Sequence, residues 1–412
     1  MHHLRDVLGS IRLRREAGRS MFLYIFGEYK LHFLAPSNIF PYLNTTMIKR
    51  NLKGLNLAEL QAFVGEVGEK KYRAAQLYGW LYASAAQSFN EMTNVSKDLR
   101  TLLSQIAFIS NIQLVTRSFS HDGTIKYLFR LEDNATIESV LIPSTVKSPE
   151  DKERLTLCVS TQVGCPLACA FCATGSMGYT RNLTTGEIVD QVLQVQRNIQ
   201  KRITNLVYMG MGEPMLNYDN VMKSVELIND DRGLNIGARH ITISTAGYAD
   251  KIRQLADDDR HVKLALSLHS LDNDKREKLM PITKKYSVDD LVDAIEFYYH
   301  KTRRRPTFEY ILFDGFNDTA VDIKLFVKLS RRIPCKVNLI PFHSIAFVHP
   351  SGIGSSLKPT PVERIEAFAD ALRKADITVM VRGSSGQDIN AACGQLAVLE
   401  AKINPNITKG EL

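Results

Sequence analysis

Apolar residues recur about every 3.6 positions in three early segments of the chain, 57–66, 72–87 and 97–108. This period is that of an amphipathic helix, so the pattern predicts a small helical module. Residues 1–46 show no clear period, and the helical region opens at Met47. We therefore expect the natural start at Met47, with 1–46 as an extension upstream of it. An authentic extension or an organelle-targeting segment is the alternative.

Strand-like segments follow the helical module, which extends over 47–108. Segments 114–119 and 125–131 flank Asp122-Gly123, a pair typical of tight β-hairpin turns, and a further strand is expected over 136–142. These segments predict a β-hairpin linker over 109–148, between the helical module and the main domain.

From about residue 154 onward, short apolar and β-branched runs alternate with helical stretches. This alternation is typical of βα units around a parallel sheet that is covered on both faces. Six or seven units favour an α/β fold with an incomplete (β/α)6-type barrel over a two-half nucleotide-binding fold. The barrel core is expected over 149–390, followed by a C-terminal loop and tail over 391–412. The predicted strands are 155–161, 204–209, 240–245, 262–268, 307–313, 335–341 and 377–382.

Two of the intervening helices carry start signals. Thr184 and Glu187 fit a capping box, in which each side chain binds the backbone amide of the other residue. Thr360, Pro361 and Glu363 combine such a box with a proline in the first turn.

Composition and charge narrow the class of protein. An apolar share of 44% with 23% charged residues is ordinary for a globular chain, and a net charge of +8 favours an anionic partner such as nucleic acid. The most apolar early stretch, Met21 to Phe26, is far shorter than the roughly 20 residues of a membrane-spanning helix. Four of the six cysteines fall between positions 158 and 172, which is unlike a secreted disulfide framework. Clustered thiols indicate a metal or redox site in a reducing cytoplasm.

The strongest chemical signal is the run Cys165-Pro-Leu-Ala-Cys169-Ala-Phe-Cys172, a CxxxCxxC motif just beyond the first barrel strand. Three thiolates at this spacing can each bind one iron of a cubane cluster, which leaves the fourth iron open to a small molecule. Cys158 lies within the preceding strand and is not placed to be a fourth ligand. Zinc is the alternative, although zinc sites favour paired CxxC units.

Polar residues also gather where the predicted strands end, which is where barrel enzymes build their sites. The Gly-rich segment Met209 to Pro214 ends the second strand, and its glycines let the backbone approach a ligand while Glu213 can accept from an ammonium group. Ser244 ends the third strand, and Ser267-Leu268-His269 ends the fourth. Each of these groups alone could be a satisfied buried residue, but together they favour a bound cofactor.

The chain resembles the radical S-adenosylmethionine superfamily, and within it the RNA adenine methyltransferases RlmN and Cfr, with RlmN the closer of the two. The resemblance covers about 47 to 400. It rests on the cysteine motif and on the runs 157–165, 209–214, 267–269, 338–341 and 391–396. It implies a 4Fe–4S cluster held by Cys165, Cys169 and Cys172, whose electron cleaves S-adenosylmethionine to a 5′-deoxyadenosyl radical. The resemblance also implies that the helical module binds RNA. This module has a basic face formed by Lys70, Lys71, Arg73, Lys97 and Arg100.

The resemblance also implies a set of cofactor contacts. The chain departs from the family at one of them, because Phe342 is followed by a histidine where the family usually has asparagine. An imidazole can still make one hydrogen bond, so this position is kept. The expected S-adenosylmethionine contacts are Gly212, Glu213, Ser244, Ser267, Leu268, His269 and His343.

Three further residues match the family's catalytic groups. Cys393 matches the thiol that accepts a methyl group from one S-adenosylmethionine and carries it while a second molecule supplies the radical. Cys158 matches the resolving thiol, which attacks the sulfur of Cys393 and leaves a transient disulfide. Glu138 matches the proton acceptor. Cys335 matches no role and is interpreted as structural.

The activity implied is methylation of adenosine C2 in 23S rRNA and of the adenosine beside the anticodon in some tRNAs. A reductase or flavodoxin-type electron donor, a monomeric state and a cytoplasmic location are expected. Methylation of adenosine C8, as by Cfr, is the nearest alternative, and a non-catalytic iron–sulfur RNA-binding or electron-transfer protein is a more distant one. Several basic runs are suited to phosphate contact: Lys201-Arg202, Arg239-His240, Lys284-Lys285, Arg303-Arg304-Arg305 and Arg331-Arg332.

Overall fold

The computed structural model describes residues 49–144, 153–383 and 385–398. The segment 1–46 and the expected start at Met47 lie outside the described residues. No helix in the described ranges is long and apolar enough to cross a membrane.

The helical module contains the three predicted helices, α1 (Leu57–Glu66), α2 (Tyr72–Tyr82) and α3 (Lys97–Ile106). Two short parallel strands, β1 (Arg50–Asn51) and β2 (Ala107–Phe108), close its ends, and η1 (Phe89–Glu91) precedes α3. The second helix is shorter than the predicted 72–87. It ends at Tyr82, and Ala85 takes the left-handed φ of 53°, which no helix interior accommodates.

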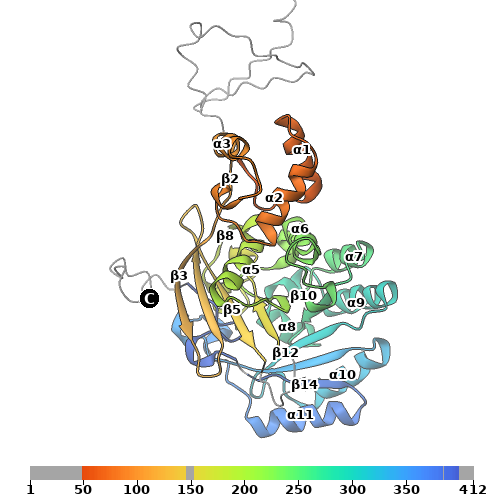
Figure 1. Ribbon diagram of the computed structural model, residues 1–412. Coiled ribbons are helices and arrows are strands. Elements are labelled where there is room, and N and C mark those ends of the chain that lie inside the picture. The colour runs from red at the N-terminus through yellow and green to blue at the C-terminus, as the bar shows by residue number, and fades with distance from the viewer. Residues whose placement is uncertain (1–48, 145–152, 384, 399–412) are drawn as a thin grey trace, which may run out of the picture. The chain divides into compact units, whose positions relative to one another are not determined.

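A ten-stranded sheet forms the centre of the rest of the chain (Figure 1). Its spatial order is β14-β13-β12-β11-β10-β9-β6-β5-β4-β3. The β-linker supplies three antiparallel strands, which are β3 (Gln113–Phe119), β4 (Ile125–Arg130) and β5 (Thr136–Pro143), and β5 pairs antiparallel with β6. From β6 onward all neighbours are parallel: β6 (Leu155–Cys158), β9 (Asn205–Tyr208), β10 (Ile241–Thr245), β11 (Lys263–Ser267), β12 (Thr307–Leu312), β13 (Lys336–Pro341) and β14 (Thr378–Val381).

Helices connect the parallel strands, and successive helices lie beside one another, as with α5 and α6 or α7 and α9 (Figure 1). Because all seven strands run in one direction, their carboxyl ends share one edge of the sheet. This arrangement confirms the predicted α/β class with its parallel βα units. The helices are α5 (Thr185–Ile199), α6 (Tyr218–Asn229), α7 (Ala249–Asp257), α8 (Asn273–Leu279), α9 (Val288–Thr302), α10 (Ala320–Arg332) and α11 (Val362–Lys374).

The two predicted helix starts differ in outcome. Thr184 and Glu187 form the predicted capping box at the start of α5. The prediction for Thr360 was wrong, because α11 begins at Val362 with Pro361 as its N-cap. The Thr360 hydroxyl instead donates to the buried Asp318 carboxylate at 3.0 Å, and this charge-assisted hydrogen bond fixes the orientation of its side chain.

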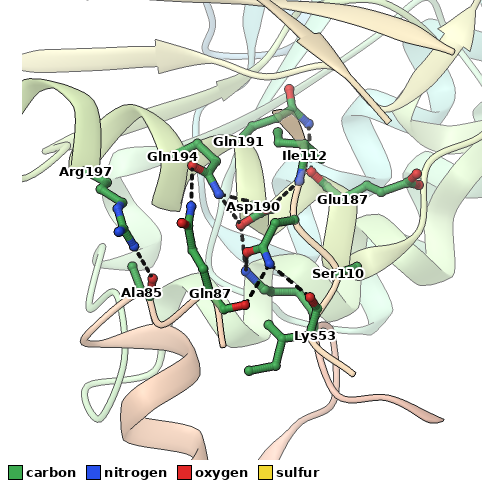
Figure 2. Close-up of polar contacts among 12 residues, drawn as sticks. Lys53, Ala85, Gln87, Ser110, Ile112, Glu187, Asp190, Gln191, Gln194 and Arg197 are labelled. Atoms are coloured by element: carbon green, nitrogen blue, oxygen red, sulfur yellow. Dashed lines mark hydrogen bonds and ion pairs between the residues drawn. The ribbon is translucent and has the colours of Figure 1, made fainter. Parts of the chain in front are cut away.

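A buried ion pair fixes the helical module to the barrel. Lys53 Nζ lies 2.7 Å from Asp190 Oδ1 of α5, and the two side chains are only 1% and 2% exposed. The Ile112 amide donates to the other Asp190 oxygen at 2.7 Å, and Figure 2 shows both partners converging on this carboxylate. Gly54 and Gly186 allow the close backbone approach, since a Cβ on Gly54 would lie 2.7 Å from the Gly186 nitrogen. The module and α5 therefore move together.

Removing one partner of this pair is expected to be costly. Asp190→Ala leaves the Lys53 ammonium buried without its counter-ion, so the free energy of unfolding should fall by about 3–5 kcal/mol. Urea denaturation followed by circular dichroism measures the change. Glu153→Ala is the matched control, because the Glu153–Lys201 pair is 44% and 58% exposed and should contribute less than about 1 kcal/mol. Equal losses in the two variants would contradict the interpretation.

Candidate active site

The three cysteines of the CxxxCxxC motif lie on one loop, between β7 (Gln162–Gly164) and α4 (Ala173–Ser176). The Cys165 amide donates to the Gly178 carbonyl at 2.7 Å, ahead of β8 (Tyr179–Asn182), and the Cys172 amide donates to the Cys169 carbonyl at 3.1 Å. All three thiols line a cavity of about 140 Å³, which we call the cofactor cavity. Its other walls come from residues at the carboxyl ends of the parallel strands.

The thiols of this cavity fit a 4Fe–4S cluster. A cubane takes one thiolate on each of three irons, so its ligands surround the cluster and do not converge on one point. In the described part of the chain, no three His, Cys, Asp or Glu side chains converge on a site for a single metal ion. Burial raises the pKa of Cys165 and Cys169, and a positively charged metal centre is what would hold them as thiolates.

The Gly-rich segment after β9 forms one wall of the cofactor cavity. Gly212 has a φ of +100°, and a Cβ there would lie 2.5 Å from the Gln162 side chain, so only glycine fits. The Glu213 carboxylate is buried and accepts from the Met215 and Ala246 amides at 3.0 and 2.8 Å. Burial raises the pKa of Glu213 to about 7, despite these two hydrogen bonds. An ammonium group of a ligand would stabilise the ionised form.

The next two strand ends complete that wall. Ser244, Ser267 and His269 all line the cofactor cavity, as the sequence analysis predicts. His269 Nδ1 accepts from the Ile311 amide at 3.0 Å, and burial lowers the His269 pKa to about 3, so the imidazole is neutral and carries its proton on Nε2. This proton is available to a ligand. Leu268 is fully buried and does not line the cavity, and its carbonyl accepts from Arg276 at 3.0 Å.

A second cavity, of about 250 Å³, adjoins the first and is called the inner cavity here. Cys158, His343 and Arg382 lie on its walls. His343 therefore faces the inner cavity and not the cofactor cavity, which puts in doubt its expected contact with S-adenosylmethionine. Burial lowers its pKa, and within the described ranges its Nε2 has no hydrogen-bond partner. This neutral imidazole can bind a polar group of a ligand.

Cys393 lies at the junction of the two cavities and contributes to both walls. The Cys393 loop is held against the loop that carries the CxxxCxxC cysteines, which we call the cluster loop. The Ala173 amide donates to the Gly394 carbonyl at 2.7 Å, and the Thr174 hydroxyl donates to the Leu396 carbonyl at 2.6 Å. Cys393 is exposed as a residue.

The β3–β4 hairpin holds the same loop from the other side. The Gly386 amide donates to Asp122 at 2.9 Å, and the Ser120 hydroxyl donates to Asp388 at 2.6 Å. Lys126 donates to the Asn390 carbonyl at 3.1 Å. The Cys393 loop is thus fixed between the linker hairpin and the cluster loop.

Cys158 and Cys393 influence each other electrostatically across the inner cavity. Burial raises the pKa of Cys158 to about 12, and the neighbouring Cys393 raises it further. Burial also raises the pKa of Cys393, whereas the Arg382 guanidinium lowers it. Arg382 lies 3.5 Å from the buried Glu309 carboxylate on the cofactor cavity wall. Sequence reasoning missed both residues, although Glu309 is a lone acid within an apolar strand.

Glu138 lies on neither cavity wall. Its carboxylate is 3.2 Å from Lys126 Nζ and accepts from the Ala397 amide at 3.1 Å. Val140 and Ile142 follow it on the same face of β5 and do line the inner cavity. The residue is therefore beside the inner cavity, with its carboxylate held by the Cys393 loop.

Most of the basic runs lie away from this site. The runs at 201–202, 239–240, 303–305 and 331–332 precede β9, β10, β12 and β13, so they lie at the amino ends of the strands. Arg332 pairs with Asp293 and Glu296, and Arg304 pairs with Asp259. The site is at the opposite edge, so these runs do not contribute to it.

Comparisons with known proteins agree with this geometry. Residues 50–109 match the family model "Ribosomal RNA large subunit methyltransferase N-terminal domain", and residues 159–327 match "Radical SAM superfamily". "Probable dual-specificity RNA methyltransferase RlmN" of Thermotoga sp. (strain RQ2) is 45% identical, over 86% of this chain and 99% of that relative. "Dual-specificity RNA methyltransferase RlmN" of Pelobacter propionicus is 43% identical, over 84% of this chain and 96% of that relative. A crystal structure of a radical SAM methyltransferase from Sphaerobacter thermophilus has a TM-score of 0.77 and 41% identity, covering 84% of this chain and 99% of that one.

A change at Gly212 tests the cofactor cavity. Gly212→Ala should weaken S-adenosylmethionine binding by at least about tenfold, or ~1.4 kcal/mol, because the new Cβ displaces Gln162, whose side chain holds the Glu213 amide. Equilibrium dialysis with anaerobically reconstituted protein gives the affinity. Gly315→Ala is the matched control, since Gly315 also has a positive φ but nothing lies within 4 Å of its added Cβ. A folded Gly212→Ala protein with unchanged affinity would show that the cofactor binds elsewhere.

Proposed function

The chain belongs to the RlmN family of radical S-adenosylmethionine RNA methyltransferases, and on that premise we propose that it methylates C2 of an adenosine in 23S rRNA. The adenosine beside the anticodon in some tRNAs is the second substrate. The observation that carries the proposal is the position of Cys393, which contributes to both the cofactor cavity and the inner cavity that contains Cys158.

The cofactor cavity holds the cluster and S-adenosylmethionine. Cys165, Cys169 and Cys172 bind one 4Fe–4S cluster, which when bound supplies the electron that cleaves S-adenosylmethionine. Glu213 accepts from the amino group of the cofactor. The Gly212 backbone, Ser244, Ser267 and the Nε2 proton of His269 bind its remaining polar atoms. Leu268 lies behind this wall and packs between the residues that form it.

Cys393 carries the one-carbon unit. Its thiolate attacks the methyl carbon of one S-adenosylmethionine, which forms an S–C bond to Cys393 and breaks the bond to the leaving group, S-adenosylhomocysteine. Arg382 favours this step because its positive charge stabilises the thiolate. The radical from a second S-adenosylmethionine removes a hydrogen atom from the S-methyl group, and the carbon radical adds to C2 of the base in the inner cavity. Two S-adenosylmethionine molecules are used in each turnover.

Glu138 and Cys158 release the product. Glu138 takes the C2 proton, and its contact with the Ala397 amide links this proton transfer to the position of the Cys393 loop. The Cys158 thiolate then attacks the Cys393 sulfur, which forms the S–S bond and breaks the S–C bond. The released methylene carbon takes up a proton and becomes the methyl group, and the surplus electron of the radical adduct would return to the oxidised cluster. Once the Cys393 sulfur carries an alkyl group it holds no negative charge, so the contribution of Cys393 to the raised Cys158 pKa disappears. An external reductant restores both thiols.

We also propose how the enzyme binds its RNA substrate and obtains electrons. A base within the inner cavity has to leave its stack, and His343 Nε2 is a donor or acceptor available to it. The helical module binds the RNA, and a flavodoxin-type protein or another reductase supplies electrons. All six cysteines are free thiols, which suits a monomeric enzyme in a reducing cytoplasm.

Methylation of C8, as by Cfr, is the closest rival. Mass spectrometry of digested rRNA and tRNA, from cells with and without this enzyme, separates 2-methyladenosine from 8-methyladenosine by retention time. We expect 2-methyladenosine to depend on the enzyme in both RNAs. Enzyme-dependent 8-methyladenosine alone would overturn the assignment.

The two catalytic thiols should have different phenotypes. Cys393→Ala removes the carrier, so no carbon reaches the RNA. Cys158→Ala leaves loading and addition intact but blocks resolution, so labelled RNA should remain covalently attached to the protein on a denaturing gel. Cys335→Ala is the control, since Cys335 is a buried thiol that lines neither cavity, and it should turn over normally.

The iron content of the same variants identifies the role of the fourth thiol in the cofactor cavity. Cys393→Ala should keep the full cluster, because Cys393 is not a ligand. Loss of iron in that variant, or normal turnover by Cys158→Ala without trapped RNA, would refute the carrier mechanism.

A further inference from the structure

Arg276 is a fully buried arginine that forms no ion pair with any carboxylate in the described part of the chain. It lies on α8 and its exposed fraction is 0%. Its guanidinium donates to three backbone carbonyls, those of Leu268, Ala246 and Ser267, and to the Thr283 hydroxyl. All four acceptors are neutral. Among the residues that the structure describes, no carboxylate forms an ion pair with it.

Such a charge needs compensation. Taking an ionised group out of water costs several kcal/mol even after the protein relaxes, and neutral carbonyls return only part of this. Burial lowers the pKa of Arg276 to about 10, so the group stays protonated at neutral pH. A negative group nearby is therefore expected when the protein is in its working state.

The position of Arg276 indicates which group this is. Two of its acceptors, Ala246 and Ser267, belong to residues on the wall of the cofactor cavity. Met280, which directly follows α8, also lines that cavity. The Ala170 amide of the cluster loop donates to the Leu279 carbonyl of α8 at 2.9 Å. The guanidinium thus lies directly behind the cluster loop.

Other cations are less suited to this role. Arg382 is near the same cavities, but the Glu309 carboxylate at 3.5 Å offsets its charge. Arg305 makes carbonyl and hydroxyl contacts like those of Arg276, to Cys335 and Thr378, but at the amino ends of the strands.

We propose that the Arg276 guanidinium is the buried counter-charge of the iron–sulfur cluster and raises its reduction potential. This inference rests on the proposed binding of the cluster by Cys165, Cys169 and Cys172. Three thiolates give the cluster a net negative charge, and reduction adds one more. A fixed positive charge in a medium of low dielectric stabilises the reduced state more than the oxidised one. Arg276 is also a positioning residue, because its hydrogen bonds hold the strand ends that bind S-adenosylmethionine.

The test is a redox titration of the anaerobically reconstituted full chain, followed by electron paramagnetic resonance. Arg276→Gln should make the cluster harder to reduce, with a fall of at least about tenfold in the reduction equilibrium constant, or ~59 mV for one electron. Arg276→Lys, which keeps the charge but not the planar set of donors, should stay close to the wild-type potential. Arg305→Gln is the matched control and should leave the potential unchanged.

An unchanged potential in Arg276→Gln, with wild-type iron content, would overturn the proposal. If the glutamine variant does not take up a cluster, the Arg276→Lys variant decides the question. A reduction potential about 59 mV below that of the wild type in Arg276→Lys would overturn the proposal. It would show that the geometry of the donors sets the potential and that the charge does not. Failure of the proposed function would look different, since the wild-type protein would then hold no reducible cluster.

Discussion

In the proposed mechanism, the Cys393 thiol has to reach both the methyl group of S-adenosylmethionine and the sulfur of Cys158, and this requirement constrains the rest of the structure. The hydrogen bonds from the Ala173 amide to the Gly394 carbonyl and from the Thr174 hydroxyl to the Leu396 carbonyl fix the Cys393 loop against the cluster loop. Without such contacts, the entropic cost of ordering the thiol would fall on every turnover. With them, Cys393 belongs to both cavity walls at once.

The other parts of the chain support this loop from different sides. The parallel strands bring Glu213, Ser244 and Ser267 to one edge, where the cofactor cavity lies. The linker hairpin holds the loop through Asp122 and Lys126. The helical module is fixed to α5 by the Lys53–Asp190 pair, so a substrate bound to the module has a defined position relative to the barrel.

Local patterns in the sequence predicted most of the fold. The seven parallel strands and three early helices follow from the alternation and the period of apolar residues, because each element has to bury one face. Tertiary competition accounts for the exceptions. Thr360 gives its hydroxyl to Asp318, and so does not cap α11. The Lys53–Asp190 pair joins residues far apart in the chain, so no local pattern could reveal it.

The site was predicted unevenly for the same reason. The cluster cysteines and the strand-end contacts lie within short motifs, and the structure brings them together in one cavity. The inward positions of Arg276 and Arg382 depend on long-range packing and cannot be read from neighbouring residues. His343 is the opposite case. Its motif predicted a contact with S-adenosylmethionine, but the residue lies on the wall of the inner cavity.

The fate of hydrogen in the transferred methyl group tests the central claim most directly. The enzyme is supplied with S-adenosylmethionine whose methyl group is fully deuterated, and the product nucleoside is analysed by mass spectrometry. If the carbon passes through Cys393, one deuterium is removed by the radical and replaced later by a proton, so the product methyl keeps two of its three deuterium atoms. A product that keeps all three would mean direct transfer to the base and would contradict the account.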